Sequence, residues 1–149
     1  MESNARAPTI TGFARRFGYL GRTVAKTLKD FVTQALETVA EVEVSDLDRL
    51  TAEGYTLLDV REGDEFAAGH IPGAIFMPRG FLEVRADLEH PKRDPRMADR
   101  SQRLVCYCGG GHRSALAAQS LQQMGFSDVV SLRGGWTAYS SADLPVEVS

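Results

Sequence analysis

The sequence predicts an α/β fold in which helices cover both faces of a parallel β-sheet. Short apolar stretches of strand length alternate with helical stretches between residues 41 and 141, and such alternation is typical of parallel sheets. The apolar stretch Tyr55–Val60 has the composition of a strand that is buried on both faces. With 149 residues, the chain is long enough for one domain with its own hydrophobic core.

Residues 1–40 are predicted to form a polar tail and a long amphipathic helix, and residues 41–149 to form the α/β domain. From Thr11 to Ala40, apolar side chains recur every three or four positions, which places them in one stripe on a helix. These side chains are Phe13, Phe17, Leu20, Val24, Leu28, Phe31, Ala35 and Val39. Three glycines weaken the first half of this helix.

The apolar stripe of this helix has several possible partners. It can pack on the domain, or it can join two copies of the chain in a homodimer. Because residues 3–29 carry six basic and no acidic side chains, a helix on a membrane surface or an organellar transit segment is a further alternative. The glycines argue against a strong membrane helix.

Three strands and three helices are predicted in the first half of the domain. The strands are residues 41–44, 55–60 and 74–77, and the helices are residues 45–52, 64–68 and 80–88. Ser45 is expected to be the N-cap of the first of these helices, because a serine hydroxyl can accept a free N–H of the first turn. Residues 90–101 contain two prolines and many charges, so we expect an exposed connection there.

Two strands and two helices are predicted in the second half of the domain. The strands are residues 103–107 and 129–132, and the helices are residues 112–124 and 136–141. Gly125 is a natural C-terminal cap for the first of these helices.

Charge and cysteine content exclude several classes of protein. The net charge of −3 gives no sign of nucleic-acid binding, and no apolar run reaches the length of a membrane span. The two cysteines, Cys106 and Cys108, are too close for a disulfide framework, which favours a reducing compartment such as the cytoplasm. Three histidines and two cysteines do not match a structural zinc site. We therefore expect no metal and no cofactor.

The most informative segment begins at a cysteine and runs through three glycines into a helix. It consists of Cys108, Gly109, Gly110, Gly111, His112, Arg113 and Ser114. A cysteine between a strand end and a helix N-terminus meets free backbone N–H groups and the positive end of the helix dipole. Both favour a thiolate, and Arg113 adds a fixed positive charge. The segment thus predicts a nucleophilic cysteine in an anion-binding cradle.

Four segments, in this order, resemble the rhodanese-like sulfurtransferase family. They are residues 58–62 (LDVRE), 69–74 (GHIPGA), 108–114 (CGGGHRS) and 132–136 (LRGGW). The resemblance covers about residues 41–146 and implies a three-layer α/β sandwich around a mostly parallel five-stranded sheet. It also implies that Cys108 accepts a sulfur atom and becomes a persulfide.

The length of the cysteine loop distinguishes relatives of this family. Rhodanese-like sulfurtransferases have four residues between the cysteine and the arginine, whereas cysteine phosphatases have five. This chain has four, Gly109–His112, and a tighter loop suits a cysteine with one extra sulfur better than a phosphoryl group. The loop contains no lysine, which leaves the preferred sulfur donor open.

Several residues near the loop have alternative roles. Arg113 is expected to bind an anionic donor, to order the loop, or both. Ser114 is expected to cap the helix, to reach the sulfur with its hydroxyl, or both. His112 is expected to contribute its backbone N–H rather than act as a base. By the resemblance, Asp59 and Arg61 lie near the loop and hold its backbone. Cys106 is expected to be a core residue rather than a resolving thiol, and Trp136 to belong to the pocket wall or to the core.

We predict a sulfurtransferase enzyme that moves a sulfane sulfur from a small anionic donor such as thiosulfate to a thiol or cyanide acceptor. The acceptor thiol can belong to a small molecule or to a protein. The alternatives are a non-enzymatic persulfide carrier and, third, a phosphatase-like or purely binding module.

Overall fold

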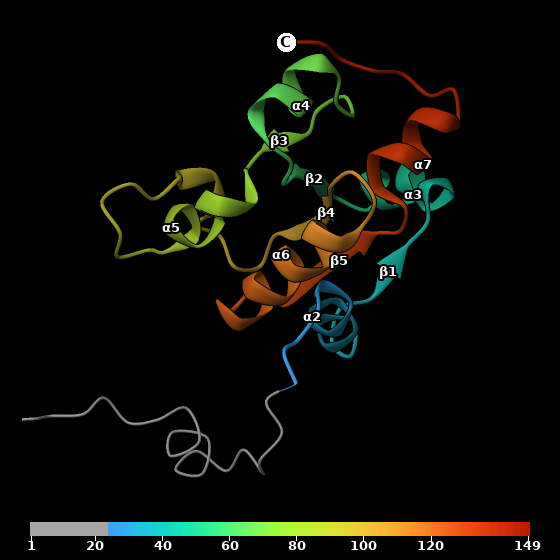
Figure 1. The fold of residues 1–149 in the computed structure, drawn as a ribbon. Coiled ribbons are helices and arrows are strands. Elements are labelled where there is room, and N and C mark those ends of the chain that lie inside the picture. Colours follow the sequence, from blue (N-terminus) through green and yellow to red (C-terminus); the bar gives the residue numbers. More distant parts are fainter. Residues whose placement is uncertain (1–23) are drawn as a thin grey trace, which may run out of the picture.

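A computed structural model describes residues 24–149 of the chain, and its centre is a five-stranded sheet (Figure 1). The strands are β1 (Glu41–Val42), β2 (Tyr55–Asp59), β3 (Ile75–Phe76), β4 (Arg103–Tyr107) and β5 (Asp128–Leu132). Their order is β1-β5-β4-β2-β3, and every neighbouring pair is parallel. The predicted α/β fold with a parallel sheet is therefore confirmed.

The helices form the two outer layers of the sandwich (Figure 1). One face of the sheet is covered by α5 (Leu82–Ala86) and α6 (His112–Gln123), and the other by α3 (Leu47–Ala52) and α7 (Gly135–Ser141). The α2 helix (Leu28–Ala35) packs on α6, on the outside of the first of these layers. The α4 helix (Gly63–Ala68) follows the carboxyl end of β2. Three 3-10 turns complete the described chain, at Val44–Asp46, Arg79–Phe81 and Pro95–Met97.

Alternation along each central strand divides the core into two halves. Leu58 and Cys106 face α5 and α6, whereas their neighbours Leu57, Val105 and Tyr107 face α3 and α7. This is expected because successive side chains of a strand point to opposite faces. Cys108, two residues after Cys106, lies in the same half of the core as Cys106.

The N-terminal helix differs from its prediction within the described residues. Residues 24–27 are not helical, and α2 begins after Thr27, whose hydroxyl accepts the Asp30 N–H while the Asp30 carboxylate accepts the Thr27 N–H. This capping box fixes the helix start. The helix also ends at Ala35 rather than Ala40, and α2 packs against α6 of the domain. The predicted helix before residue 24 lies outside the described residues.

The start of α3 also differs from its prediction. Ser45 is not its N-cap, because a 3-10 turn over Val44–Asp46 precedes the helix. The side chain of Asp46, not that of Ser45, accepts the N–H of Glu43 at 2.8 Å. The connection over residues 90–101 is not wholly exposed either, since Met97 is fully buried in it. Within residues 24–149, we find no helix with the length and apolar character needed to cross a membrane.

Candidate active site

The sulfur of Cys108 lies at the centre of a ring of backbone N–H groups. Cys108 directly follows β4, and Gly111, with a φ of 104°, is the N-cap residue of α6. The thiol sulfur accepts N–H groups of Gly111 at 3.1 Å and of Ser114 at 3.3 Å. Both donors belong to the first turn of α6, where the N–H groups have no partner within the helix. This geometry stabilises negative charge on the sulfur.

Two buried hydroxyl groups extend the cradle. Ser114 Oγ lies 3.4 Å from the Cys108 sulfur and 2.8 Å from Ser131 Oγ. Because Gly111 rather than Ser114 is the N-cap residue, the Ser114 hydroxyl is free to face the sulfur. It can accept a hydrogen bond from the thiol or donate one to the thiolate. Sequence reasoning missed Ser131; the available signal was a hydroxyl among the apolar side chains that follow Asp128 in strand β5.

The N-terminus of α7 holds the other side of the loop. Trp136 N–H donates to the Cys108 carbonyl at 2.7 Å, and Thr137 N–H donates to the Gly109 carbonyl at 3.0 Å. Gly135 packs directly against this backbone, and a Cβ there would overlap the carbonyl oxygen of Cys108. The segments 108–114 and 132–136 are thus in contact, and both α6 and α7 hold the loop in place.

Arg113 forms a two-point ion pair with Glu65 of α4. Its two terminal nitrogens lie 2.8 and 3.0 Å from the two carboxylate oxygens. Arg113 Nη2 also lies 3.1 Å from the place a Cβ would take on Gly109, so the guanidinium packs against the loop. The hydrogen bond from Arg113 lowers the pKa of Glu65 to about 2. Sequence reasoning missed Glu65, which lies 48 residues from Arg113.

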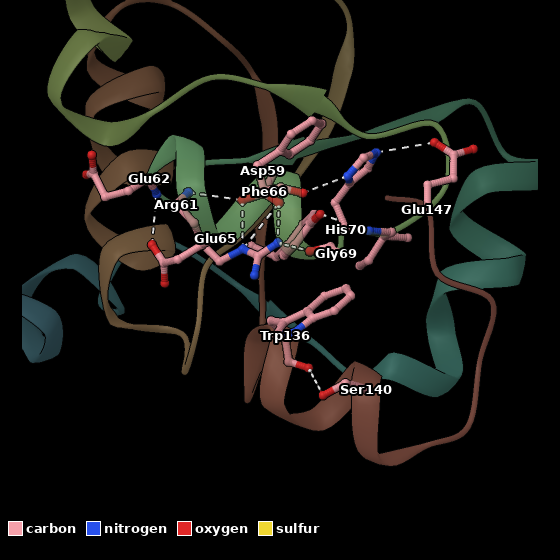
Figure 2. A network of polar contacts seen from close by, with 12 residues as sticks. Asp59, Arg61, Glu62, Glu65, Phe66, Gly69, His70, Trp136, Ser140 and Glu147 are labelled. Carbon is pink, nitrogen blue, oxygen red and sulfur yellow. Dashed lines mark hydrogen bonds and ion pairs between the residues drawn. The ribbon is translucent and has the colours of Figure 1, made fainter. Parts of the chain in front are cut away.

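Asp59 and Arg61 form a buried ion pair beside the loop (Figure 2). Arg61 Nη2 lies 2.8 Å from Asp59 Oδ2 and donates to the Gly69 carbonyl at 2.7 Å. Its guanidinium also stacks 4.6 Å above the ring of Trp136. We expected this pair to hold the loop backbone. Its side-chain hydrogen bonds instead join the two residues and reach the Gly69 carbonyl at the end of α4. The Arg61 guanidinium also lies over the rings of Trp136 and of Tyr107, which directly precedes Cys108.

Neutralising Asp59 is expected to destabilise the fold. The variant Asp59→Asn leaves the Arg61 guanidinium, which is only 3% exposed, without its counter-charge. We expect the free energy of unfolding to fall by about 3 kcal/mol, measured by urea denaturation. The control Asp64→Asn removes a charge from an exposed side chain of α4 and should change this free energy by less than about 0.5 kcal/mol. Equal effects of the two variants would contradict the assigned role of the pair.

With this geometry in place, comparisons with known proteins decide the family. The sequence profile described as "Rhodanese-like domain" matches residues 43–142. The chain belongs to this family.

The rhodanese-like domain is similar to proteins from several bacteria. It is 36% identical over 110 residues to a sulfurtransferase of Allochromatium vinosum, covering 72% of this chain and 94% of that protein. It is 32% identical over 112 residues to the thiosulfate sulfurtransferase GlpE of Shewanella oneidensis, covering 72% of this chain and 99% of that one.

A solved structure from Rhodopseudomonas palustris is also similar to this rhodanese-like domain. That protein is described as one of unknown function and a possible tyrosine phosphatase. The TM-score is 0.77 at 32% identity, with 85% of this chain and 98% of that chain covered.

Two other loop residues of the rhodanese-like domain do not hold the sulfur. Gly110 and His112 are exposed, and the N–H donors to the sulfur come from Gly111 and Ser114 instead. His70 satisfies a turn, because its Nδ1 lies 2.9 Å from the Phe66 carbonyl and its Nε2 lies 3.2 Å from the Glu147 carboxylate (Figure 2).

The two cysteines of the rhodanese-like domain have different surroundings. Cys106 is completely buried, and this burial raises the pKa of its thiol to about 12. It is therefore a protonated core residue at neutral pH. Cys108 is also buried, with 1% of its surface exposed, but its sulfur accepts two backbone N–H groups, from Gly111 and Ser114. A reactant can touch this sulfur only if the glycine loop or the cysteine side chain shifts.

The described part of the rhodanese-like domain contains no group of three or more His, Cys, Asp or Glu side chains placed to hold a metal ion. The chemistry that the site offers is that of a cysteine sulfur held by N–H and hydroxyl groups.

Proposed function

We propose that this protein is a sulfurtransferase that carries a sulfane sulfur on Cys108 and passes it to a thiol or cyanide. The observation that supports this function best is the pair of N–H donors, Gly111 and Ser114, on the Cys108 sulfur. Such donors stabilise a thiolate and, after sulfur transfer, a persulfide anion. Relatives named sulfurtransferases point the same way.

In the first half-reaction, the Cys108 thiolate attacks the outer sulfur of the donor. With thiosulfate, a new S–S bond forms at Cys108 while the S–S bond of the donor breaks, and sulfite leaves with the electron pair of that bond. Cys108 then carries a persulfide anion. The three glycines of the loop have no side chains of their own that could cover the cysteine.

In the second half-reaction, an acceptor attacks the outer sulfur of the persulfide. A thiolate acceptor becomes a persulfide and cyanide becomes thiocyanate, while the Cys108 thiolate leaves with the electron pair of the broken S–S bond. The cytoplasm, which we propose as the location, supplies thiols. Two half-reactions joined by a covalent intermediate predict ping-pong kinetics.

We propose that the hydroxyl of Ser114, held by Ser131, changes its hydrogen bond as the negative charge moves from one sulfur atom to the other. When Cys108 is a thiolate, the Ser114 hydroxyl can donate to the sulfur while accepting from Ser131, which lies 2.8 Å away. When the charge moves to the outer sulfur of the persulfide, the hydroxyl can turn without breaking its contact with Ser131. The loop of four residues between Cys108 and Arg113 supports sulfur transfer over the phosphatase-like alternative.

A persulfide carrier is the second candidate, because Cys108 is only 1% exposed. A buried persulfide that waits for a dedicated partner protein would turn over slowly with small acceptors. Steady-state assays with thiosulfate and cyanide separate the two functions. We expect parallel lines in double-reciprocal plots at several cyanide concentrations, as for a ping-pong enzyme. Stoichiometric loading of sulfur without turnover would instead favour the carrier.

A further inference from the structure

The positive charge beside the cysteine loop, that of Arg113, is already paired with the carboxylate of Glu65. Arg113 supplies the only Arg or Lys side chain between Cys108 and Ser114. Both of its terminal nitrogens bind the two oxygens of Glu65. A second guanidinium nearby, that of Arg61, is matched by Asp59 in the same way. A donor that approaches Cys108 thus meets an arginine whose charge is already neutralised.

The Glu65 carboxylate is held in place by its own helix. Besides the contacts with Arg113, its Oε2 accepts the backbone N–H of Glu62 at 2.8 Å, at the start of α4 (Figure 2). Figure 2 also shows that the carboxylate of Glu62 points away from that of Glu65. The pair between Glu65 and Arg113 is therefore preformed, and a donor anion must compete with it.

This arrangement discriminates between donors by their charge. Thiosulfate carries two negative charges and would need a free cation to offset the cost of leaving water. A small alkyl persulfide reacts as the neutral R–S–S–H and brings no charge of its own out of water. The negative charge arises only after transfer, on the new Cys108 persulfide, beside the N–H groups of Gly111 and Ser114.

We propose that Glu65 determines donor specificity by neutralising Arg113, so that a small alkyl persulfide is preferred over thiosulfate. This inference rests on the proposed sulfur transfer. In the step, the Cys108 thiolate attacks the terminal sulfur of R–S–S–H, the donor S–S bond breaks, and R–S⁻ leaves with its electron pair. The proton of the new Cys108 persulfide passes to R–S⁻, which gives R–S–H and the persulfide anion.

The variant Glu65→Gln tests this proposal, because glutamine keeps an oxygen acceptor for the Glu62 N–H and for Arg113 but removes the charge. With thiosulfate, we expect KM to fall and kcat/KM to rise about 10-fold. With cysteine persulfide as donor, kcat/KM should change less than about 2-fold. In the wild-type protein, kcat/KM for cysteine persulfide should exceed that for thiosulfate by at least about 10-fold. This wild-type comparison holds even if the variant folds poorly.

Asp64→Asn is the matched control, because it removes the same charge from the neighbouring, exposed position of α4. If the ion pair is responsible, the KM for thiosulfate falls in Glu65→Gln and stays unchanged in Asp64→Asn. The proposal is overturned if the wild-type protein uses thiosulfate better than cysteine persulfide. It is also overturned if Glu65→Gln leaves the KM for thiosulfate unchanged, or if Glu65→Gln and Asp64→Asn change this KM equally. Sulfur loading of Cys108 by either donor would leave the proposed function standing in those cases. The absence of loading by both donors would overturn the function and the proposal together.

Discussion

Replacing Cys108 with serine is expected to abolish sulfur transfer while the fold is retained. Serine has nearly the shape of cysteine, and its oxygen can accept the N–H groups of Gly111 and Ser114 that now bind the sulfur. A hydroxyl cannot form a persulfide, so kcat/KM with any sulfur donor should fall at least about a thousandfold. Rate measurements together with a thermal unfolding curve check both parts of this prediction.

Cys106→Ala is the matched control for this variant, because Cys106 is the other cysteine of the same core half. Burial holds its thiol in the protonated form, with a pKa of about 12. We expect Cys106→Ala to cost about 1 kcal/mol of stability through the small cavity that it leaves, with little change in kcat. A comparable loss of transfer in both variants would contradict the assignment of the nucleophile.

The variant Gly135→Ala is expected to damage both the fold and the active-site loop. Gly135 has a φ of 48°, and a Cβ there would overlap the Cys108 carbonyl oxygen and lie 3.0 Å from the carbonyl carbon of Gly109. Both neighbours are backbone, so the loop must move. We expect the free energy of unfolding to fall by about 3 kcal/mol. Because the loop carries the nucleophile, kcat should fall about 100-fold in the fraction that folds.

Gly54→Ala separates the two causes of the predicted loss of stability, which are backbone strain at a positive φ and steric overlap of the Cβ with the loop. Gly54 also has a positive φ, of 93°, but a Cβ there would have no heavy atom within 4 Å. The variant Gly54→Ala therefore introduces backbone strain without a steric overlap. We expect its free energy of unfolding to fall by about 1 kcal/mol and its kcat to stay unchanged. Urea denaturation and steady-state rates of both variants test this. Equal losses of stability would show that the contact between α7 and the loop is unimportant.

The sequence predicted the parallel sheet and the cysteine loop because their signals are local. The apolar stretch Tyr55–Val60 and the run from Cys108 to Ser114 each depend on neighbouring residues. The errors at the helix starts have a local cause too. At Thr27 and Asp46, a side chain caps a turn that the apolar periodicity does not report.

Other parts of the site could not be predicted, because they depend on contacts between distant segments. Glu65 meets Arg113 across 48 residues, and Ser131 meets Ser114 across 17. The amides of Trp136 and Thr137 that hold the loop carbonyls are backbone groups, which no side-chain pattern identifies. The contact of Arg61 with the Gly69 carbonyl at the end of α4 also follows only from the packing of α4 beside Trp136.

The central claim is that the cradle of N–H groups allows Cys108 to carry a sulfur atom. Intact-mass measurement of the full chain, after exposure to thiosulfate or to cysteine persulfide, tests it most directly. We predict a gain of one sulfur atom that maps to Cys108, disappears on addition of cyanide and is absent from Cys108→Ser. No gain with either donor, or the same gain in Cys108→Ser, would contradict the claim.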